Sequence, residues 1–452
     1  MTARRWLVPL VVATGLGACG TKSSKKDVAP DSRDSAPAVT YYGHAKSVLD
    51  AKCATCHRAG EIAPFDMTTF AGASQVKAAI AAAVTSGKMP PWQADASCNK
   101  YHNDGSLNDQ DKQTLLNWVA QDAPEGDLAS FKAVTAVEQA APVYDTTLTM
   151  AEAYTPKIIP DDYRCFLLRW PQTESRFITG FKFVPGQRQM AHHMLAYAVP
   201  KSTEDFFTAM DKADPGPGYT CFGGPTNSRD RRIRVTQVAG WAPGKDGEST
   251  PPGVGLKVEP GALIIVQMHY NILTGEPVPD QSTIKFQTTA QVERPGASFL
   301  FTNFGWLEKN GMPIKAGAER VEKETNENLS KYMGILGADT GVASGEPFLL
   351  HRVGLHMHQL GEETSMTLVR KDGGTQCLLH IPKWDFNWQG SFRLAQPVLV
   401  QPGDQIKLKC RWDNSAANQR VVNGVRGEPR DVEWGEGTGD EMCLMSLLVT
   451  RP

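Results

Sequence analysis

From about residue 140 to its end, the chain consists of short apolar runs with turn residues between them. Runs such as RFITGFKFV, ALIIVQMHYNI and HRVGLHMHQL alternate or stay apolar, and Gly, Pro, Asp and Asn separate them. Such runs have the length of strands. The 41 glycines and 30 prolines of the chain agree with many turns. The pattern predicts a mainly β fold with two β-sandwich domains, at 151–290 and 291–452.

Residues 39–128 have the spacing of helices instead. GHAKSVLDAKCATC and ASQVKAAIAAAVTSGKM are rich in alanine, and SLNDQDKQTLLNWVAQDAP begins with polar residues and ends in proline. Alanine has the highest intrinsic helix propensity, and proline stops a helix. We therefore expect a small all-α domain at 39–128, followed by a linker at 129–150.

The first residues have the pattern of an export signal. Arg4 and Arg5 give a basic start, the apolar run 6–16 is too short to span a membrane, and LGAC ends at Cys19. The LGAC sequence resembles the lipobox of bacterial lipoproteins. This implies that residues 1–19 are a lipoprotein signal, cleaved before Cys19, whose thiol receives a lipid. We expect an exported protein anchored to a bacterial membrane, the outer membrane, and facing the periplasm. A plain signal peptide is the alternative.

The composition adds three limits. Residues 20–38, GTKSSKKDVAPDSRDSAPA, are too polar to fold and are expected to be a flexible tether. With 47 basic and 49 acidic residues the net charge is −2, so no nucleic-acid partner is expected. The nine cysteines of an exported chain permit disulfides without proving any.

CATCH, at residues 53–57, is a Cys-x-x-Cys-His motif. Cys53 and Cys56 lie on one helical turn, so both thiols can form thioethers to one heme, and His57 can bind the iron from the same side. In an exported chain the motif predicts one covalently attached c-type heme, and 39–128 resembles a small c-type cytochrome domain. A redox or zinc-binding Cys-x-x-Cys followed by a chance histidine is the alternative.

The second axial ligand of this heme is a choice between two methionines. Met89 in GKMPPW stands before two prolines, which make the loop rigid and can hold the thioether at the iron. Met67 in FDMTTF is the competitor. We expect Met89, and simple packing of a loop methionine is the ordinary interpretation against it.

Five of the ten histidines fall in three short stretches. His192 and His193 are adjacent in MAHHML, and His269 lies in the apolar run IIVQMHYN. On a regular strand, adjacent side chains point to opposite faces. Adjacent histidines can therefore share one metal only if the backbone bulges or the imidazoles bend around. One core histidine and one surface histidine is the simpler alternative.

The third stretch, GLHMHQLG, places His356 and His358 at positions i and i+2, so on a strand both would face one way. Near the C-terminus, GDEMCLM contains Met442. Imidazole together with a thioether suits copper, which accepts soft sulfur in its reduced state, whereas zinc rarely takes methionine. The pattern therefore favours copper over a zinc-binding structural protein.

In order and spacing, the motifs HHML, IIVQMHYN, LHMHQLG and DEMC resemble the copper type II, ascorbate-dependent monooxygenases, the family of peptidylglycine α-hydroxylating and dopamine β-monooxygenases. The resemblance covers roughly residues 150–452. It implies two jelly-roll sandwiches with one copper ion each, facing across a solvent cleft. The ligands of the electron-transfer copper match His192, His193 and His269. The ligands of the oxygen-binding copper, where hydroxylation takes place, match His356, His358 and Met442.

The resemblance also implies two disulfides, Cys165–Cys221 and Cys410–Cys443. Cys98 and Cys377 have no counterparts in the family. They are either free thiols or partners of each other.

The substrate-binding positions of the peptide-amidating members are not kept. Their arginine two residues before the His-x-His motif is Gly354 here, and Arg352 is displaced by two. The tyrosine and asparagine that follow their DEMC stretch are Ser446 and Leu444 here. Neither peptidylglycine nor dopamine is therefore carried over as substrate.

No acid or base can be assigned from the sequence. Asp440 and Glu441 are expected to support their strand or to face solvent. Tyr270 is expected to pack, with a contact to His269 as the alternative. WDFNWQ, at 384–389, is expected to pack in a core, with pocket lining as the alternative.

Together these features predict a monooxygenase that hydroxylates a C–H bond of a small organic molecule with O2. His356, His358 and Met442 would form its catalytic site. The fused heme is expected to pass electrons from a periplasmic donor to two copper ions, and ascorbate or another external reductant is the open alternative as electron source. A non-catalytic heme and copper electron-transfer, or copper-binding, lipoprotein is the alternative function.

Overall fold

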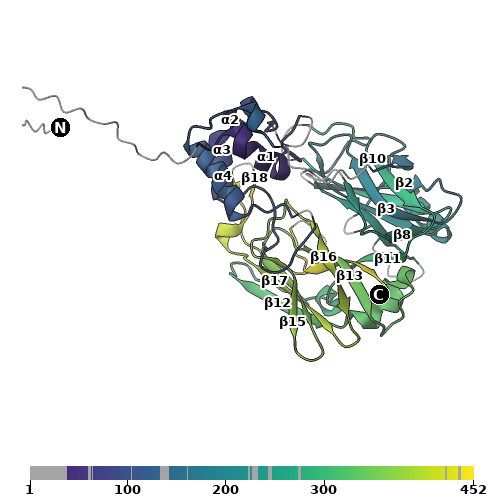
Figure 1. Cartoon of the computed structure of the whole chain (residues 1–452). Helices are drawn as coiled ribbons and strands as arrows, with labels where there is room; N and C mark the ends of the chain where they lie inside the picture. Colours follow the sequence, from purple (N-terminus) through teal and green to yellow (C-terminus); the bar gives the residue numbers. More distant parts are fainter. Residues whose placement is uncertain are drawn as a thin grey trace, which may run out of the picture. The chain divides into compact units, whose positions relative to one another are not determined.

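The computed structural model describes most of the chain, and Figure 1 labels several of its helices and strands. The described residues are 38–59, 63, 65–102, 104–132, 142–159, 161–221, 224–226, 233–242, 247–272, 276–422, 425–435 and 439–452. The expected export signal, nearly all of the expected tether and the middle of the expected linker lie outside them. Within the described residues, no helix has both the length and the apolar character that crossing a bilayer requires.

Helices form before residue 121, where the sequence predicts them. A π-helical turn at Tyr41–Ala45 is followed by α1 Lys46–Lys52, α2 Phe70–Gln75, α3 Lys77–Thr85 and α4 Asp109–Ala120. Thr69 and Asn108 cap α2 and α4, because each side chain accepts the backbone N–H three residues further on. Among the described residues, the later helical elements are α5 Glu204–Ala213, α6 Met333–Leu336 and 3-10 turns at Leu128–Ser130, Lys201–Thr203, Phe304–Leu307, Leu329–Tyr332, Ala338–Thr340 and Ala416–Asn418.

Strands make up most of the regular structure after residue 145. The strands are β1 Thr146–Thr149, β2 Asp161–Arg169, β3 Arg176–Val184, β4 Ala191–Val199, β5 Tyr219–Thr220, β6 Thr236–Trp241, β7 Gly247–Ser249, β8 Val254–Val258, β9 Leu263–Asn271, β10 Thr283–Thr289, β11 Arg294–Phe301, β12 Val321–Glu327, β13 Phe348–His356, β14 Gly361–Val369, β15 Thr375–Ile381, β16 Ser391–Val400, β17 Gln405–Trp412, β18 Val421–Val422, β19 Val425–Arg426 and β20 Leu444–Thr450. The prediction of a mainly β chain is confirmed.

The strands form three larger sheets and the β18–β19 ribbon. One sheet has the order β5-β2-β9-β4-β6, another β12-β17-β14-β15, and the nine-stranded sheet runs β1-β10-β3-β8-β11-β20-β13-β16 with β7 beside β3. This last sheet continues across position 290, because β8 and β11 pair in parallel with Arg294 opposite Val254. The boundary at 290 and the jelly-roll topology stay predictions.

Two large apolar cores use the two halves of the nine-stranded sheet. Side chains of β3, β8 and β10 join those of β2, β4 and β9 in one core, which includes Phe166, Met268 and Phe286. The other core joins β13, β16 and β20 to β14, β15 and β17, and includes Leu350 and Trp412. A fully buried side chain of this size stabilises the fold by about 1.5–3 kcal/mol relative to exposure. These two cores hold the strands that carry the candidate site.

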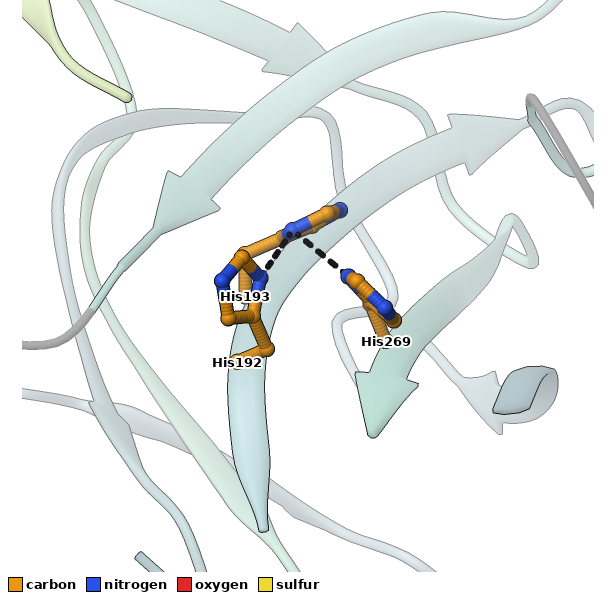
Figure 2. A group of neighbouring side chains, drawn as sticks. All are labelled: His192, His193 and His269. Carbon is orange, nitrogen blue, oxygen red and sulfur yellow. Dashed lines mark hydrogen bonds between the residues drawn. The ribbon is translucent and has the colours of Figure 1, made fainter. Parts of the chain in front are cut away.

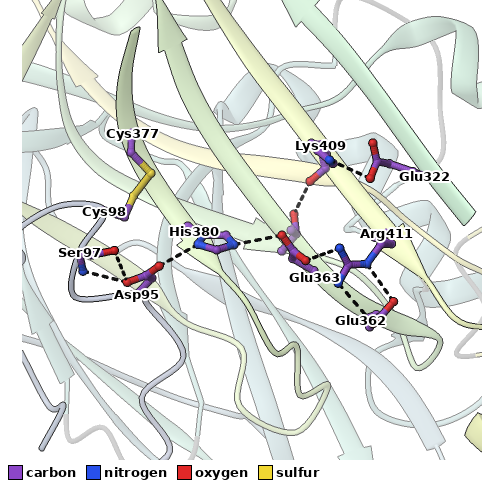
Figure 3. Close-up of polar contacts among 11 residues, drawn as sticks. Asp95, Ser97, Cys98, Glu322, Glu362, Glu363, Cys377, His380, Lys409 and Arg411 are labelled. Carbon is purple, nitrogen blue, oxygen red and sulfur yellow. Dashed lines mark hydrogen bonds and ion pairs between the residues drawn. A yellow bond between two sulfur atoms is a disulfide. The ribbon is translucent and has the colours of Figure 1, made fainter. Parts of the chain in front are cut away.

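Residues 92–102, here called the crossing segment, attach the helical part of the chain to the second core. Cys98 is disulfide-bonded to Cys377, and the carboxylate of Asp95 lies 3.0 Å from Nδ1 of His380 (Figure 3). The backbone N–H of Asp95 donates to the carbonyl of His380 at 2.8 Å, and Tyr101 forms an antiparallel bridge with Leu394. Of the two alternatives for the Cys98 and Cys377 thiols, pairing with each other is therefore the correct one.

The other two disulfides follow the predicted pairing. Cys165 is bonded to Cys221, and Cys410 is bonded to Cys443. The second bond ties β17 to the residue that directly precedes β20. Cys53 and Cys56 remain thiols.

Candidate metal centres

The three-histidine group is assembled by a bulge at the start of β4. His193 lies opposite His269 on β9, and Ala191 lies opposite Tyr270, so His192 is an extra residue without a partner position. Such a bulge re-aims a side chain that a regular strand would turn to the other face. Figure 2 shows the imidazoles of His192 and His193 leaving one strand and meeting His269. The backbone bulge that would let two adjacent histidines share one metal is therefore present.

The Nδ1 atoms of these histidines converge. Nδ1 of His193 lies 3.3 Å from Nδ1 of His192 and 3.2 Å from Nδ1 of His269. One ring nitrogen from each of the three residues falls within 4.8 Å of the others, a spacing that one metal ion can bridge. Burial lowers the pKa of His192 to about 4 and lowers the pKa of His193 and His269 as well. The imidazoles are therefore neutral at pH 7, and lone pairs are available for a cation.

Asp161 and Tyr163 on β2 fix the orientation of His269. Nε2 of His269 donates to the Asp161 carboxylate at 2.9 Å, which leaves the lone pair on Nδ1 toward the other histidines. Burial alone would raise the pKa of Asp161, but hydrogen bonds from His269 and Asn271 hold it below its usual value. The ring of Tyr163 stacks on His269 with centroids 4.1 Å apart. Neither residue was singled out from the sequence, although both lie within four residues of Cys165, for which the family resemblance implies a disulfide.

The second histidine pair stands at the end of β13. His356 is the last residue of the strand, and His358 lies beyond it. The ladder stops there because the backbone N–H of His358 donates to the carboxylate of Glu441 at 2.9 Å instead of to a strand. The two imidazoles still meet, edge to face, with centroids 5.0 Å apart. The two rings therefore meet where the chain leaves β13, and not on one face of a regular strand as expected.

Hydrogen bonds fix the ring atoms that this pair presents. Nδ1 of His356 donates to the side-chain oxygen of Gln389, and Nδ1 of His358 donates to the backbone carbonyl of Asp440 at 3.0 Å. The Nε2 lone pairs are therefore the ones available to a metal. Burial and the neighbouring His358 lower the pKa of His356 to about 3, so it too is neutral at pH 7.

Glu441 precedes Met442 and hydrogen-bonds to the segment that carries His358. Its buried carboxylate accepts the N–H groups of His358 and Leu360 and the indole N–H of Trp412, at 2.6–2.9 Å. Burial raises the pKa of Glu441 to about 7. Of the two roles expected for Glu441, support of its strand is the one observed.

Both groups border one cavity of about 230 Å³. Its ligand-type lining residues are His193, His356, His358 and Met442. Phe386 lies where the groups approach: its ring stacks on His192 with centroids 5.8 Å apart and meets His358 edge-on at 6.1 Å. Core packing and pocket lining were the two interpretations of WDFNWQ, and each holds for part of it. Phe386 and Gln389 line the cavity. Trp384 is buried, and its indole N–H donates to the carbonyl of His358.

Tyr270, the neighbour of His269, packs inside the protein. Its hydroxyl donates to Asp280 at 2.9 Å, and its ring is fully buried in the first large core. Packing was therefore the correct interpretation.

The CATCH motif forms a tight turn after α1. The backbone N–H groups of Cys56 and His57 both donate to the carbonyl of Cys53. Nδ1 of His57 is buried and, among the described residues, has no hydrogen-bond partner. Met67 is packed in the helical core, whereas Met89 is partly exposed at the start of the loop that leads to the crossing segment. The choice of Met89 over Met67 stays a prediction.

Two models of known families match the chain. The N-terminal domain of copper type II ascorbate-dependent monooxygenase matches residues 146–276, and the C-terminal domain matches residues 348–448. Together they cover about half of the chain, and all six candidate copper ligands fall inside them.

Curated relatives are similar over the same part. MOXD1 homolog 1 of Drosophila melanogaster is 22% identical over 294 residues, which are 62% of this chain and 39% of that protein. DBH-like monooxygenase protein 1 of Mus musculus is 25% identical over 272 residues, which are 58% of this chain and 40% of that protein. The human protein of the same name is 24% identical with the same coverage. The matched part thus spans about two fifths of the length of these relatives.

Proposed function

The chain belongs to the copper type II ascorbate-dependent monooxygenase family, and from this premise we propose that it hydroxylates a C–H bond of a small organic substrate with O2. One substrate molecule, one O2, two electrons and two protons give the hydroxylated product and water. Bound copper supplies the one-electron chemistry at both ligand groups. The observation that carries the proposal is the cavity that both groups border, because substrate held there lies beside His356, His358 and Met442.

The donor sets fit copper in both groups. Three neutral imidazoles are offered by His192, His193 and His269. The second group, here called the His356 group, consists of His356, His358 and Met442, and the thioether of Met442 stabilises reduced copper. In this proposal the first group stores an electron and the second is the place of hydroxylation. Asp161, Gln389 and the carbonyl of Asp440 orient the rings through the nitrogens that do not face the metal.

The lining of the cavity favours a neutral, mainly apolar substrate. None of the described residues that border it carries a carboxylate, ammonium or guanidinium group. Leu195, Leu300, Leu355 and Trp241 supply apolar surface. Arg352, the displaced arginine, pairs instead with Glu248 at 3.0 Å. An anionic or cationic substrate would therefore enter this cavity without a countercharge, which is costly in an apolar site.

We propose further that Cys53 and Cys56 carry a c-type heme, with His57 and Met89 as axial ligands. Burial raises the pKa of the Cys53 thiol to about 11, which is unlike the acidic thiol of a redox Cys-x-x-Cys. Burial lowers the pKa of His57, so its imidazole is neutral and can bind iron. Among the described residues, the buried Nδ1 of His57 has no hydrogen-bond partner. This agrees with a site that is completed by a bound group such as heme.

The crossing segment supports a role of this heme as electron donor. Met89 lies three residues before its start, and Gln93 within it donates to the carbonyl of Asp385 at 2.9 Å. The next residue, Phe386, stacks on His192. A short path of bonds and contacts therefore leads from the proposed heme ligand to the three-histidine group. We propose that electrons from a periplasmic donor take this path in a lipoprotein anchored through Cys19.

The experiment that tests the function is metal and heme analysis of periplasmically matured protein, with two variants. Met442→Leu removes one ligand, and Met445→Leu is the matched control, since Met445 is also a buried methionine and lies three residues further on, in β20. Leucine keeps the volume of methionine, so both variants are expected to fold. We expect two coppers and one heme in the parent and in Met445→Leu, and about one tightly held copper in Met442→Leu. Zinc in place of copper would overturn the proposal.

The O2 balance separates the enzyme from its alternative. Screening neutral, apolar compounds should find one whose hydroxylation consumes one O2 per product. O2 consumption without a hydroxylated product for any of them would favour an electron-transfer protein on the same fold.

A further inference from the structure

Gln237 of β6 lines the cavity that both ligand groups border, here called the substrate cavity. Its Oε1 atom is buried and, among the described residues, accepts no hydrogen bond. Each of the other unpartnered buried atoms in the described part of the chain belongs to a residue outside the lining of this cavity. A buried acceptor without a donor destabilises a fold, so such an atom beside a cavity indicates a ligand that supplies the donor.

A bulge in β6 turns Gln237 toward the substrate cavity. On β4 and β6, Leu195 lies opposite Gly240, and Tyr197 lies opposite Gln237, so Val238 is an extra residue without a partner position. In a regular strand Gln237 would face away from Gly240, because an odd number of positions separates them. The extra residue reverses this alternation and gives Gln237 the face of Gly240, which also lines the cavity.

The other two amide side chains in the described lining of this cavity are already bonded within the protein. The amide nitrogen of Gln267 donates to the carbonyl of Cys221 at 2.8 Å. The side-chain oxygen of Gln389 accepts from Nδ1 of His356. These contacts fix the orientation of both amides. Gln237 is therefore the amide of the lining whose oxygen is available to a ligand.

Gln237 lies far along the strands from the metal ligands. Tyr197, the residue opposite it, follows His193 by four positions on β4. At ~3.3 Å per residue this separation is about 13 Å. His356 and His358 contribute to the lowered pKa of His193, so the second ligand group is close to His193. A molecule that reaches from Gln237 to the second group is therefore elongated, and its two ends meet different chemistry.

We propose that Gln237 is a specificity-determining residue whose amide oxygen accepts a hydrogen bond from a hydroxyl group of the substrate. The inference rests on the proposed function, because it names the substrate class of the same cavity: an elongated, neutral alcohol with an apolar body. Its hydroxyl group lies at the end remote from the carbon that is hydroxylated. An alcohol is the smallest neutral donor, and unlike an amide it brings no carbonyl that needs a donor of its own.

The first test measures stability without any ligand. Gln237→Leu keeps the approximate volume of the side chain and removes an unpartnered buried oxygen, so the midpoint of urea unfolding should not fall. Gln267→Leu is the matched comparison, because it removes the amide that bonds to the Cys221 carbonyl, and it should lower the midpoint. An equal fall in both variants would show that the Gln237 amide is bonded within the protein and would overturn the inference.

The second test measures binding by calorimetry on matured full-length protein without reductant, so that no turnover occurs. The probes are 1-heptanol and its isomer hexyl methyl ether, of which only the alcohol can donate a hydrogen bond. Gln237→Leu should weaken binding of 1-heptanol by about threefold to tenfold, the effect of one hydrogen bond, and should not weaken binding of the ether. Gln396→Leu, at an exposed position of β16 outside the cavity, should change neither affinity.

Kinetics give a third measurement for any alcohol that the enzyme hydroxylates. Gln237→Leu should raise KM by the same factor and leave kcat nearly unchanged. The reason is that a hydrogen bond remote from the reacting carbon is equally strong in the bound substrate and in the transition state.

Three outcomes would overturn the inference: no binding of 1-heptanol by the parent, an equal loss of affinity for both isomers in Gln237→Leu, or a loss for the ether alone. The last result would mean that the amide nitrogen, and not the oxygen, faces the cavity. Copper content and the O2 balance of the parent decide the proposed function separately. A parent that distinguishes the isomers through Gln237 but takes up no copper would keep the binding assignment and overturn the proposed function.

Discussion

The carboxylate of Asp161 accepts a hydrogen bond from Nε2 of His269 at 2.9 Å, and this contact determines which nitrogen of His269 faces the neighbouring histidines. The two residues lie on adjacent strands, β2 and β9. Tyr163 is directly opposite His269, and Asp161, two positions before Tyr163, is opposite Asn271. Asn271 also donates to this carboxylate, at 2.6 Å. A residue of β2 thus determines which ring nitrogen of His269, a candidate metal ligand on β9, carries the proton.

Replacing Asp161 by alanine should weaken copper binding at the three-histidine group by about 10- to 100-fold, the usual effect of removing a carboxylate behind a histidine ligand. The His356 group should keep its copper. Competition with a chromophoric copper(I) chelator measures both affinities. Asp205→Ala, at an exposed position of α5, is the control. Equal losses at both groups would show that Asp161 stabilises the fold rather than one ligand.

Glu441→Ala should lower the free energy of unfolding by about 3 kcal/mol or more, because three buried donors lose their acceptor and each costs about 1–3 kcal/mol. It should also release the copper held with Met442. Trp412→Phe removes only one of the three donors and should cost less. Urea unfolding and copper analysis of both variants check this order. A cost below 1 kcal/mol for Glu441→Ala would mean that water replaces the carboxylate.

His351 should make the protein less stable in mild acid. It is buried in β13, and Nε2 lies 2.9 Å from the hydroxyl of Thr450. Burial, with Arg294 and Arg352 nearby, lowers the pKa of His351 to about 4. The unfolded chain therefore binds a proton near pH 6.5 that the folded chain refuses, and stability falls as pH drops from 6.5 toward 4.

The size of this effect follows from the same two pKa values. Between pH 7 and pH 5 the parent should lose about 2 kcal/mol more than His351→Gln does. Denaturant unfolding of both proteins at the two pH values gives the difference directly. Parallel pH dependence of parent and variant would exclude His351 as the source.

The disulfide and the ion pair of the crossing segment should differ in strength. Removing Cys98 and Cys377 together, as alanines, should lower the free energy of unfolding by roughly 2–4 kcal/mol. Asp95→Asn should cost less than about 1 kcal/mol, because Asp95 and His380 are both partly exposed. Thermal unfolding of the two variants compares them, and amide exchange in residues 92–102 should rise only when the disulfide is absent.

The sequence predicts the parts of the structure that follow local patterns. Short apolar runs became strands, and the alanine-rich stretches became α1 and α3. The family resemblance identified the two disulfides in the β part. These features depend on periodicity or on a preserved motif, both of which can be read along the chain.

Other features depend on contacts between distant residues, which no local pattern contains. The bulge at His192 is visible only as a register against β9. His358 leaves β13 because Glu441, 83 positions away, takes its N–H. Gln389, Phe386 and Asp161 are ordinary residues in sequence and become part of the site only through the partners that folding gives them. The sequence likewise indicated the attachment of the crossing segment only through two cysteines without counterparts in the family, Cys98 and Cys377.

The bond from Cys98 to Cys377 also constrains how the protein can be made. It joins residues 279 positions apart, and Cys165 and Cys221 are synthesised between them. Oxidation in the order of synthesis would therefore pair Cys98 wrongly, either with Cys165 or with the thiols of CATCH. Correct pairing of Cys98 therefore has to wait until residue 377 is synthesised or be reached by disulfide exchange, and the heme attachment proposed for Cys53 and Cys56 would require these two thiols to stay reduced meanwhile. A chain that ends before residue 377 lacks the partner of Cys98, so the thiol of Cys98 stays unpaired or forms a wrong disulfide.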